Sequence, residues 1–190
     1  MLKDIENWYT SWFDSPYYHI LYKNRDDKEA GLFMKNLTSF LKLSPNSKIL
    51  DLACGKGRHS KYLNQLGYHV TGIDLSPQSI AYAKQFENDK LFFEEHDMSL
   101  PYPQKFDAVF NLFTSFGYFE NEEDNLNTIK SIKKELNPNG FGVIDFLNSD
   151  YVEKHLVPLE TKIVDGISFN IQREVKAGYI LKHINFTHHY

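Results

Sequence analysis

Apolar and polar residues follow two different periods along the middle of the chain. Over residues 28–43 the apolar positions recur with the period of a helix, so Ala30, Phe33, Met34, Leu37, Phe40 and Leu41 share one side. Further along, short apolar runs bounded by turn residues predict buried strands. The predicted order is helix 28–43, strand 48–52, helix 58–66, strand 68–73, helix 77–87, strand 91–95, strand 106–111, helix 122–136 and strand 140–146.

This alternation of strands and helices with short connections predicts the α/β class. We expect a doubly wound, mainly parallel, Rossmann-like sheet with helices on both faces. Ligands on such sheets bind beyond the carboxyl ends of the strands. Four polar residues fall at or near such ends, and a single site would account for all of them: Asp51, Asp74, Asp97 and Asn111.

The C-terminal part of the chain has a different pattern. Residues 167–175 alternate with period two, and residues 180–186 repeat this. Lys176-Ala177-Gly178 lies between the two segments as a turn. The pattern predicts an antiparallel hairpin.

Composition narrows the classes of function. The 190 residues suit one sizeable core, and a net charge of −4 without a long basic run argues against a nucleic-acid partner. No apolar stretch is long enough for a membrane span, and the N-terminus lacks a signal-peptide core. A single cysteine cannot form an internal disulfide, so we expect a cytoplasmic protein.

The segment 49–57, Ile-Leu-Asp-Leu-Ala-Cys-Gly-Lys-Gly, carries the strongest functional signal. Gly55 and Gly57 lie between a strand and a helix start, where backbone can approach a ligand and N–H groups face an anion. We expect a larger side chain at Gly57 to fill cofactor space. Dinucleotide sites carry a third glycine where this chain has Ser60.

Two acids next to this turn also suit a cofactor other than a dinucleotide. Asp51 would repel a pyrophosphate but can hold an ammonium group, directly or through water. Asp74 ends the next apolar stretch and is placed to accept both hydroxyls of a ribose. The alternative for Asp74 is a role at the helix start, although Ser76 before Pro77 is the better cap.

The strings Asp51-Leu-Ala-Cys-Gly-Lys-Gly57 and Gly72-Ile-Asp-Leu-Ser76 resemble the class I S-adenosylmethionine (SAM)-dependent methyltransferases. The likeness is greatest to the small-molecule branch of this family and runs from about Trp8 to Asn148. It implies SAM as the cofactor and in-line methyl transfer to a small-molecule acceptor that the sequence does not identify.

The resemblance also implies roles for individual residues. Asp97 would read the adenine amino group, and Arg25 would clamp the methionine carboxylate. Their alternatives are a solvated loop acid and a surface arginine. The predicted cofactor residues are Tyr18, Arg25, Asp51, Ala53, Cys54, Gly55, Gly57, Asp74, Leu75, Asp97, Met98, Asn111 and Leu112.

The acceptor side is predicted from aromatic residues. Residues 113–119 follow the strand where the family places the wall between cofactor and acceptor, with core packing as the alternative. The predicted acceptor residues are Tyr22, Phe113 and Tyr118.

The sequence does not identify a catalytic group. If the acceptor needs a base, Tyr18, Tyr118, His96 and Asp145 are the candidates. Cys54 has no evident activator and suits a buried spacer. His59 and His96 lack metal-ligand spacing, so we expect no metal site.

We expect two regions in the chain. Residues 1–148 form the SAM-binding domain, with an aromatic cap segment over 1–30, and residues 149–190 form the hairpin on the substrate side. The family sheet has seven strands, and we expect this chain to stop before the closing ones. The strand around 140–146 would then expose an edge, so we expect either a homodimer through that edge or lower stability than a longer version.

Two other classes of protein compete with this interpretation. One is a non-catalytic SAM-binding protein, which would bind SAM without forming S-adenosylhomocysteine. The other is an NAD-dependent oxidoreductase, which Ser60 and Asp51 argue against. A native-state ligand raises the melting temperature, so SAM and NAD⁺ can be compared directly.

Overall fold

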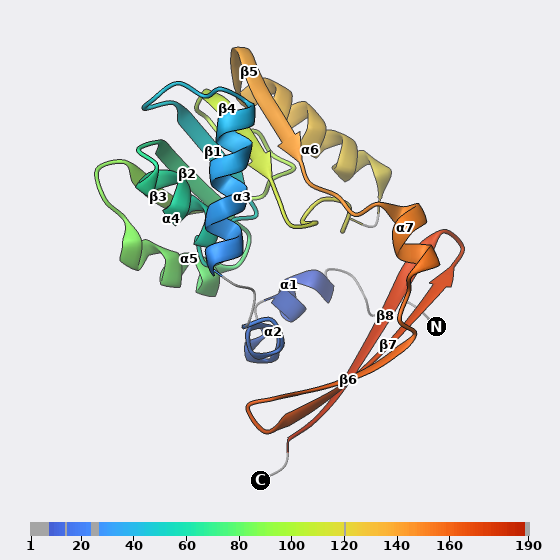
Figure 1. Ribbon diagram of the computed structural model, residues 1–190. Helices are drawn as coiled ribbons and strands as arrows, with labels where there is room; N and C mark the ends of the chain where they lie inside the picture. The colour runs from blue at the N-terminus through green and yellow to red at the C-terminus, as the bar shows by residue number, and fades with distance from the viewer. Residues whose placement is uncertain (1–7, 14, 24–26, 120, 189–190) are drawn as a thin grey trace. The chain divides into compact units, whose positions relative to one another are not determined.

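Five parallel strands form the larger sheet of the protein, in the order β3-β2-β1-β4-β5 (Figure 1). The computed structural model describes residues 8–13, 15–23, 27–119 and 121–188. The five strands are β1 (Lys48–Leu52), β2 (His69–Asp74), β3 (Leu91–Glu95), β4 (Phe106–Asn111) and β5 (Leu136–Ile144). The predicted parallel sheet is therefore confirmed.

Helices cover both faces of this sheet, as the doubly wound prediction requires (Figure 1). One face packs against α3 (Asp27–Phe40), α4 (Arg58–Gln65) and α5 (Pro77–Ala83), which continues into the 3₁₀ turn η1 (Lys84–Phe86). The other face packs against α6 (Glu122–Glu135). Neighbouring residues of one strand serve opposite faces: Ile49 lies in the first core and Leu50 in the second.

Helix starts in this unit follow from capping chemistry. The Ser76 hydroxyl oxygen accepts a hydrogen bond from the Ser79 N–H at 3.0 Å, and Pro77 occupies the first helical turn of α5. Ser76 is thus the cap that the sequence predicts. Asn121 caps α6 in the same way, accepting from the Asp124 N–H at 2.8 Å.

Strand β5 is less regular than the sequence suggests. Its pairing with β4 jumps between Phe106↔Leu136 and Ala108↔Phe141, and Asn139 within the jump has a left-handed φ of 65°. The strand therefore begins earlier than the predicted 140. Among the described strands, β4 is the neighbour of β5 in the sheet order, so the other side of β5 is an edge there.

A second compact unit combines Ser15–Asn24 with Leu147–Tyr190, while Met1–Asp14 and Arg25–Phe146 make up the first. Part of the expected N-terminal cap segment therefore belongs with the C-terminal region. The first unit also includes α1 (Trp8–Phe13). The second consists of α2 (Pro16–Leu21), α7 (Ser149–Lys154), β6 (Leu159–Val164), β7 (Ile167–Lys176) and β8 (Tyr179–His188).

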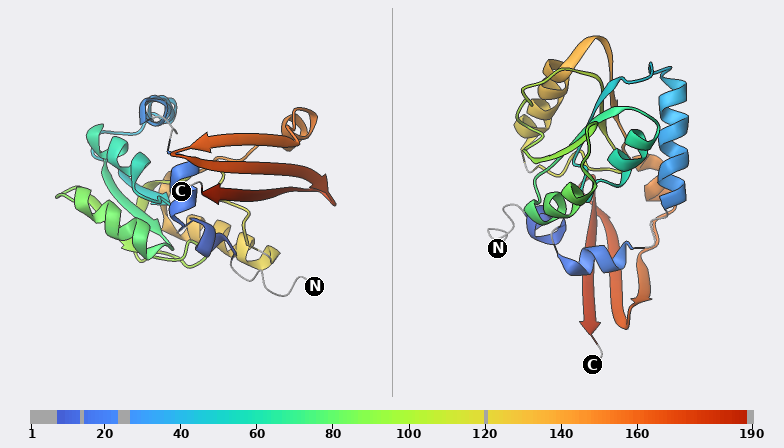
Figure 2. Two further views of the ribbon diagram at one scale, coloured as in Figure 1. Left: turned by 90° about the horizontal axis from the view of Figure 1, so that it is seen from below. Right: turned by 90° about the vertical axis from the view of Figure 1, so that its left-hand side faces the viewer.

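The strands of this second unit form an antiparallel sheet in the order β6-β7-β8 (Figure 2). The predicted hairpin corresponds to β7 and β8, joined through Ala177 and Gly178, both with positive φ. The sequence analysis missed β6. Its turn to β7 is Asp165-Gly166, also with positive φ at both residues, which is a strong hairpin signal.

Alternate side chains of β7 form the core of the second unit. Ile167, Phe169 and Ile171 are buried, as the period-two pattern requires. Helix α2 belongs to the same core, because Leu21 is buried and the Tyr17 ring lies 4.0 Å from that of Phe186, centroid to centroid. Apolar burial therefore holds this unit together around its middle strand.

The longest helices in the described part of the chain are α3 and α6, with 14 residues each. Within these described ranges, no helix combines the length and the apolar character that a membrane crossing needs.

Candidate cofactor site at the carboxyl ends of the strands

The turn that follows β1 has an unusual concentration of left-handed backbone. Ala53, Gly55 and Gly57 have φ values of 56°, 54° and 75°. Hydrogen bonds fix the turn, with the Cys54 N–H donating to Ile73 O at 2.9 Å and the Gly57 N–H to Cys54 O at 3.0 Å. A left-handed alanine costs conformational energy, so the surroundings hold this turn in a defined shape.

The two glycines of the turn have different surroundings. A Cβ added to Gly55 would have no heavy atom within 4 Å, so the backbone there borders open space. A Cβ added to Gly57 would lie 2.5 Å from the Phe93 ring. The expectation that a side chain at Gly57 fills cofactor space is therefore wrong. Such a side chain would clash with the ring of Phe93 in the core. Gly55 is the glycine whose backbone faces open space.

Asp74 ties the end of β2 to this turn. Its Oδ2 accepts the Gly55 N–H at 2.8 Å, and its Oδ1 accepts the Ser76 N–H at 2.9 Å. Each carboxylate oxygen has two acceptor positions, so these two backbone bonds alone do not saturate the carboxylate. Asp74 thus fixes the shape of the turn at the place where a ribose is expected.

Asp51 lies at the same edge but inside the protein. Its side chain is 1% exposed, and its Oδ2 accepts the Ser60 hydroxyl at 2.5 Å. The pKa of Asp51 is raised to about 7, chiefly by burial; the hydrogen bond from Ser60 opposes this rise, and the charge of Asp74 adds to it. A cationic group placed nearby would favour the ionised form of Asp51.

The loop after β3 is held against β2 and α6. The His96 N–H donates to Asp74 O at 3.1 Å, and the Ser131 hydroxyl donates to Ser99 O at 2.9 Å. Asp97 folds back on its own loop, where its Oδ1 accepts the Ser99 N–H at 2.8 Å. The loop is therefore shaped independently of any ligand.

Glu135 is a supporting residue that the sequence analysis missed. It is fully buried, and its Oε1 accepts the Tyr102 N–H at 2.8 Å, which fixes the far end of the same loop. Burial raises the pKa of this carboxyl. The helical pattern around Glu135 gave no sign of this, because apolar periodicity does not show which polar side chains are buried.

Asn111 ends β4 and carries a buried polar atom without a hydrogen-bond partner among the described residues. The side chain is 0% exposed, and its Nδ2 lies 3.4 Å from both Leu52 O and Met98 Sδ. Within the described part of the chain its Oδ1 accepts no hydrogen bond. A buried carbonyl oxygen of this kind is costly, and a ligand donor would relieve it.

The loop after Asn111 is strained and anchored. Phe113 and Thr114 have left-handed φ values of 57° and 61°. Asp145, at the end of β5, accepts the Phe113 N–H on Oδ2 at 2.9 Å and the Thr114 N–H on its backbone oxygen at 3.2 Å. Asp145, a candidate base, thus already serves as a structural acceptor.

The Phe113 ring gathers side chains from two helices. It stacks on the His59 ring at 4.5 Å and 23°, and the Phe33 ring meets it edge-on at 6.0 Å. The Arg58 guanidinium carbon lies 4.9 Å from the centre of the same ring. Arg58 was not among the predicted site residues.

The remaining predicted cofactor residues differ in how exposed they are to solvent. Leu112 and Cys54 are buried in the first core, and Leu75 is 43% exposed. Burial, followed by the charges of Asp51 and Asp74, raises the pKa of the Cys54 thiol well above its ordinary value. Cys54 is therefore a poor nucleophile at neutral pH.

The predicted aromatic cap residues are divided between the two units. Tyr18 and Tyr22 belong to the second unit, where their rings lie 5.0 Å apart. Tyr118 is in the first unit and meets the Phe13 ring edge-on at 5.3 Å. Arg25 lies outside the described residues, so its predicted role remains a prediction.

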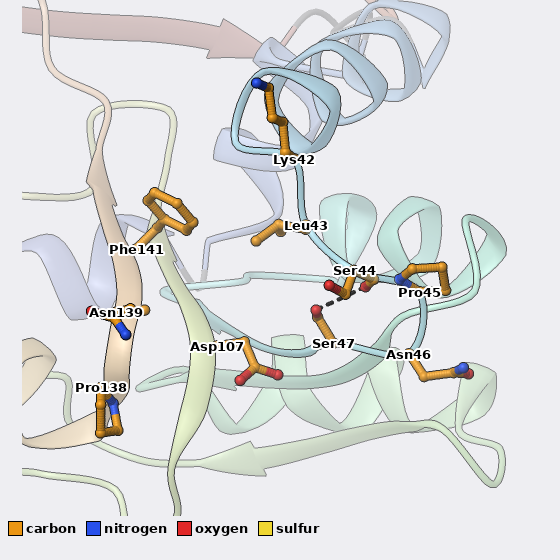
Figure 3. Close-up of a pocket in the computed structure, with 11 residues that line it drawn as sticks. Lys42, Leu43, Ser44, Pro45, Asn46, Ser47, Asp107, Pro138, Asn139 and Phe141 are labelled. Carbon is orange, nitrogen blue, oxygen red and sulfur yellow. Dashed lines mark hydrogen bonds between the residues drawn. The ribbon is translucent and has the colours of Figure 1, made fainter.

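A polar hollow of about 320 Å³ lies at the opposite edge of the sheet (Figure 3). Its walls come from the segment that leads into β1 and from the amino-terminal parts of β4 and β5, including Ser47, Asp107 and Asn139. The rule for parallel sheets places ligands at the carboxyl ends, so this hollow is separate from the candidate site. Among the described residues, no group of His, Cys, Asp and Glu side chains has the arrangement of a metal site.

The geometry agrees with the comparisons to known proteins. A family model described as "Methyltransferase domain" matches residues 49–140, which include β1 to β4 and the whole candidate edge from the glycine turn to the loop after Asn111. The part of the chain that holds the candidate site is therefore similar to methyltransferase domains.

Individual proteins that are similar to this chain are also methyltransferases. The chain is 35% identical over 111 residues to the putative methyltransferase YqeM of Bacillus subtilis, covering 56% of this chain and 45% of that protein. It is 32% identical over 122 residues to rat glycine N-methyltransferase, covering 55% of this chain and 42% of the relative. The chain thus spans less than half the length of these relatives.

Solved methyltransferase structures share the fold. A SAM-dependent methyltransferase from Clostridium acetobutylicum superposes with a TM-score of 0.73 at 20% identity, over 90% of this chain and 71% of the other. CalS10 from Micromonospora echinaspora, titled an amino pentose methyltransferase, gives a TM-score of 0.68 at 17% identity, over 91% and 81% of the two chains.

The buried state of Asp51 predicts a pH-dependent stability. Its raised pKa means that the protonated form stabilises the fold below about pH 4, and that this contribution is lost as the pH rises through about 7. In urea unfolding from pH 4.5 to 8, the wild-type free energy of unfolding should fall relative to that of Asp51→Asn. Ser60→Ala should move the fall to higher pH. A constant difference between wild type and Asp51→Asn would contradict the buried, titrating acid.

The two glycines of the turn predict unequal losses of stability. Gly57→Ala should lower the free energy of unfolding by about 2–4 kcal/mol, since a Cβ would clash with Phe93 in addition to the left-handed strain. Gly55→Ala, with open space, should lose only the strain, about 1 kcal/mol. Urea unfolding measures both, and equal losses would mean that the two positions do not differ as described.

Proposed function

We propose that this chain is the cofactor-binding part of a SAM-dependent methyltransferase that acts on a small molecule. The observation that carries the proposal is the edge formed by the open glycine turn, Asp74 and the partnerless Asn111 oxygen. The match to a methyltransferase domain supports it. Two of the similar proteins, a glycine N-methyltransferase and a sugar N,N-dimethyltransferase, act on small molecules.

The residues present fit SAM at this edge. Gly55 leaves space where a thioether or sulfonium chain would pass, and the Asp74 carboxylate would accept hydrogen bonds from the ribose hydroxyls. The Asn111 oxygen and the Asp51 carboxylate are acceptors for an ammonium group. Asp97 and Met98 would face the adenine.

Bound SAM supplies a methyl group on a sulfonium, which is already an activated leaving group. The protein then contributes alignment and exclusion of water. Asp74 and the glycine turn would hold the nucleoside in place, and the anchored loop of Leu112 and Phe113 would face the acceptor. The aromatic surface of Phe113 and Tyr118 suits an apolar wall around the transferred group.

The partner and location that we propose follow from composition. We propose a small-molecule acceptor and no nucleic-acid partner, because the net charge is −4 and basic residues do not cluster along the sequence. We propose a cytoplasmic location, because the chain has a single cysteine. The edge of β5 is the surface through which we propose pairing of two copies.

Two measurements test the proposal, one of ligand binding and one of methyl transfer. SAM and S-adenosylhomocysteine should raise the melting temperature, and NAD⁺ should not. Formation of S-adenosylhomocysteine across a panel of amines, amino sugars and alcohols would establish catalysis. Binding of SAM without product on any acceptor would favour a non-catalytic SAM-binding protein.

Asp74→Ala tests the ribose contact. It removes a charge-assisted hydrogen bond worth about 1.5–3 kcal/mol, so affinity for S-adenosylhomocysteine should fall by roughly ten- to a hundredfold in calorimetric titration. Asp89→Ala, which removes an exposed acid in the loop before β3, is the matched control and should bind as the wild type does. A folded Asp74→Ala protein with unchanged affinity would remove Asp74 from the site.

A further inference from the structure

The loop between β3 and β4 has no helix or strand of its own. Residues 96–105 cross from the end of β3 to the start of β4, and such an irregular segment has backbone N–H and C=O groups that need partners elsewhere. Asp97 and Met98 lie at the start of this loop, where the proposed function places the adenine. The contacts that hold the loop therefore bear on how the adenine is bound.

Helix α6 supplies two of these partners from one face. Ser131 and Glu135 are four residues apart, so they lie one above the other on the helix. The Ser131 hydroxyl donates to Ser99 O at 2.9 Å, and Oε1 of Glu135 accepts the Tyr102 N–H at 2.8 Å. The two bonds join the helix to both ends of one short segment of the loop.

Both helix residues are buried, which makes this arrangement costly. Ser131 is 2% exposed and Glu135 is 0% exposed. Oε2 of Glu135 has no hydrogen-bond partner in the part of the chain that the structure describes. Burial raises the pKa of Glu135, and the bond from the Tyr102 N–H is the first of the effects that oppose this rise. An apolar side chain would fill the same space at a lower cost, so the contribution of Glu135 is its charge-assisted bond to the loop.

Hydrogen bonds inside the loop extend this control to Asp97. Its Oδ1 accepts the Ser99 N–H at 2.8 Å, and its backbone oxygen accepts the Leu100 N–H at 3.0 Å. Asp97 thus forms a turn with the residue that Ser131 holds. Fixing Ser99 and Tyr102 from α6 therefore also fixes the position of the Asp97 carboxylate.

We propose that Glu135 and Ser131 are positioning residues that hold the loop 96–102 against the adenine and so set the selectivity for this base. The inference rests on the proposed function, because it requires a nucleoside at this edge. Both residues act through the backbone of Ser99 and Tyr102, without contact to the ligand. The competing role is purely structural, in which the two bonds stabilise the fold and leave the selectivity for the base unchanged.

Two ligands that differ at the base separate these roles. S-adenosylhomocysteine has an amino group on its base, and S-inosylhomocysteine has an oxygen in its place, so a hydrogen-bond donor becomes an acceptor. An ionised carboxylate only accepts hydrogen bonds, so a fixed Asp97 should favour the first ligand. In calorimetric titration, the wild type should bind S-adenosylhomocysteine about tenfold more tightly than S-inosylhomocysteine, or by a larger factor.

Glu135→Leu removes the acceptor of the Tyr102 N–H and fills the space with an apolar side chain. A loop that keeps its binding position for only about a tenth of the time weakens a ligand that depends on it about tenfold. We expect this loss for S-adenosylhomocysteine and a change of less than about threefold for S-inosylhomocysteine, so the preference for adenine falls. Glu135→Gln keeps an acceptor oxygen and should recover most of the preference.

Ser131→Ala is the smaller change, at the other bond. It removes a neutral hydrogen bond, so affinity for S-adenosylhomocysteine should fall by roughly two- to tenfold, with a smaller loss for S-inosylhomocysteine. Because it removes only a hydroxyl, this variant carries the test if Glu135→Leu does not fold.

Ile132→Val is the matched control for stability. Ile132 lies on the same helix but packs in the second core, so this change should lower the melting temperature and leave both affinities as in the wild type. Melting temperatures without ligand show that each variant is folded.

The outcomes are distinct. If the variants weaken both ligands equally, or weaken neither, Glu135 and Ser131 are structural and the proposal fails. A wild type without a preference for adenine also contradicts it. In each of these cases the wild type still binds S-adenosylhomocysteine, so the proposed function stands. A wild type that binds neither ligand would overturn the proposed function, and this inference with it.

Discussion

The two hydrogen bonds that Asp74 accepts from backbone N–H groups determine the shape of the candidate site. Gly55 donates from the turn after β1 and Ser76 from the start of α5, at 2.8 and 2.9 Å. One carboxylate thereby joins the ends of two neighbouring strands and sets the distance between the glycine turn and the place of a ribose. The left-handed residues of the turn are tolerated because this bond and the Cys54 bond to β2 hold them.

Around this bond the protein keeps polar groups that a simple core would not contain. Asp51 is buried beside Ser60, and Asn111 has a buried oxygen without a described partner. Both cost stability on their own, and both gain from a cation or donor placed at the strand ends. We take this as stability given up for binding.

The sequence predicted the part of the fold that depends on local pattern. Strands 48–52, 91–95 and 106–111 were placed at their observed bounds because each is an apolar run between turn residues. β6 was missed because its alternation is weak: Ile163 is 76% exposed, and Leu159 is 68% exposed. The Asp165-Gly166 turn beside it was the available signal.

The sequence predicted the site residues that lie at strand ends. It did not predict the features of the site that depend on packing between distant segments. Asp74 and Gly55 follow from a motif that fixes strand, turn and helix together. The role of Gly57 depends on Phe93, 36 residues away, and the position of Arg58 depends on a loop that β4 and β5 shape. Such contacts between distant segments leave no periodic trace in the sequence.

The central claim is that one ligand spans the carboxyl edge of β3, β2, β1 and β4. A crystal structure with S-adenosylhomocysteine tests it most directly. We expect adenine beside Asp97 and Met98, and both ribose hydroxyls on Asp74. A ligand in the polar hollow at the amino ends of the strands, or an edge that stays empty at saturating ligand, would contradict the claim.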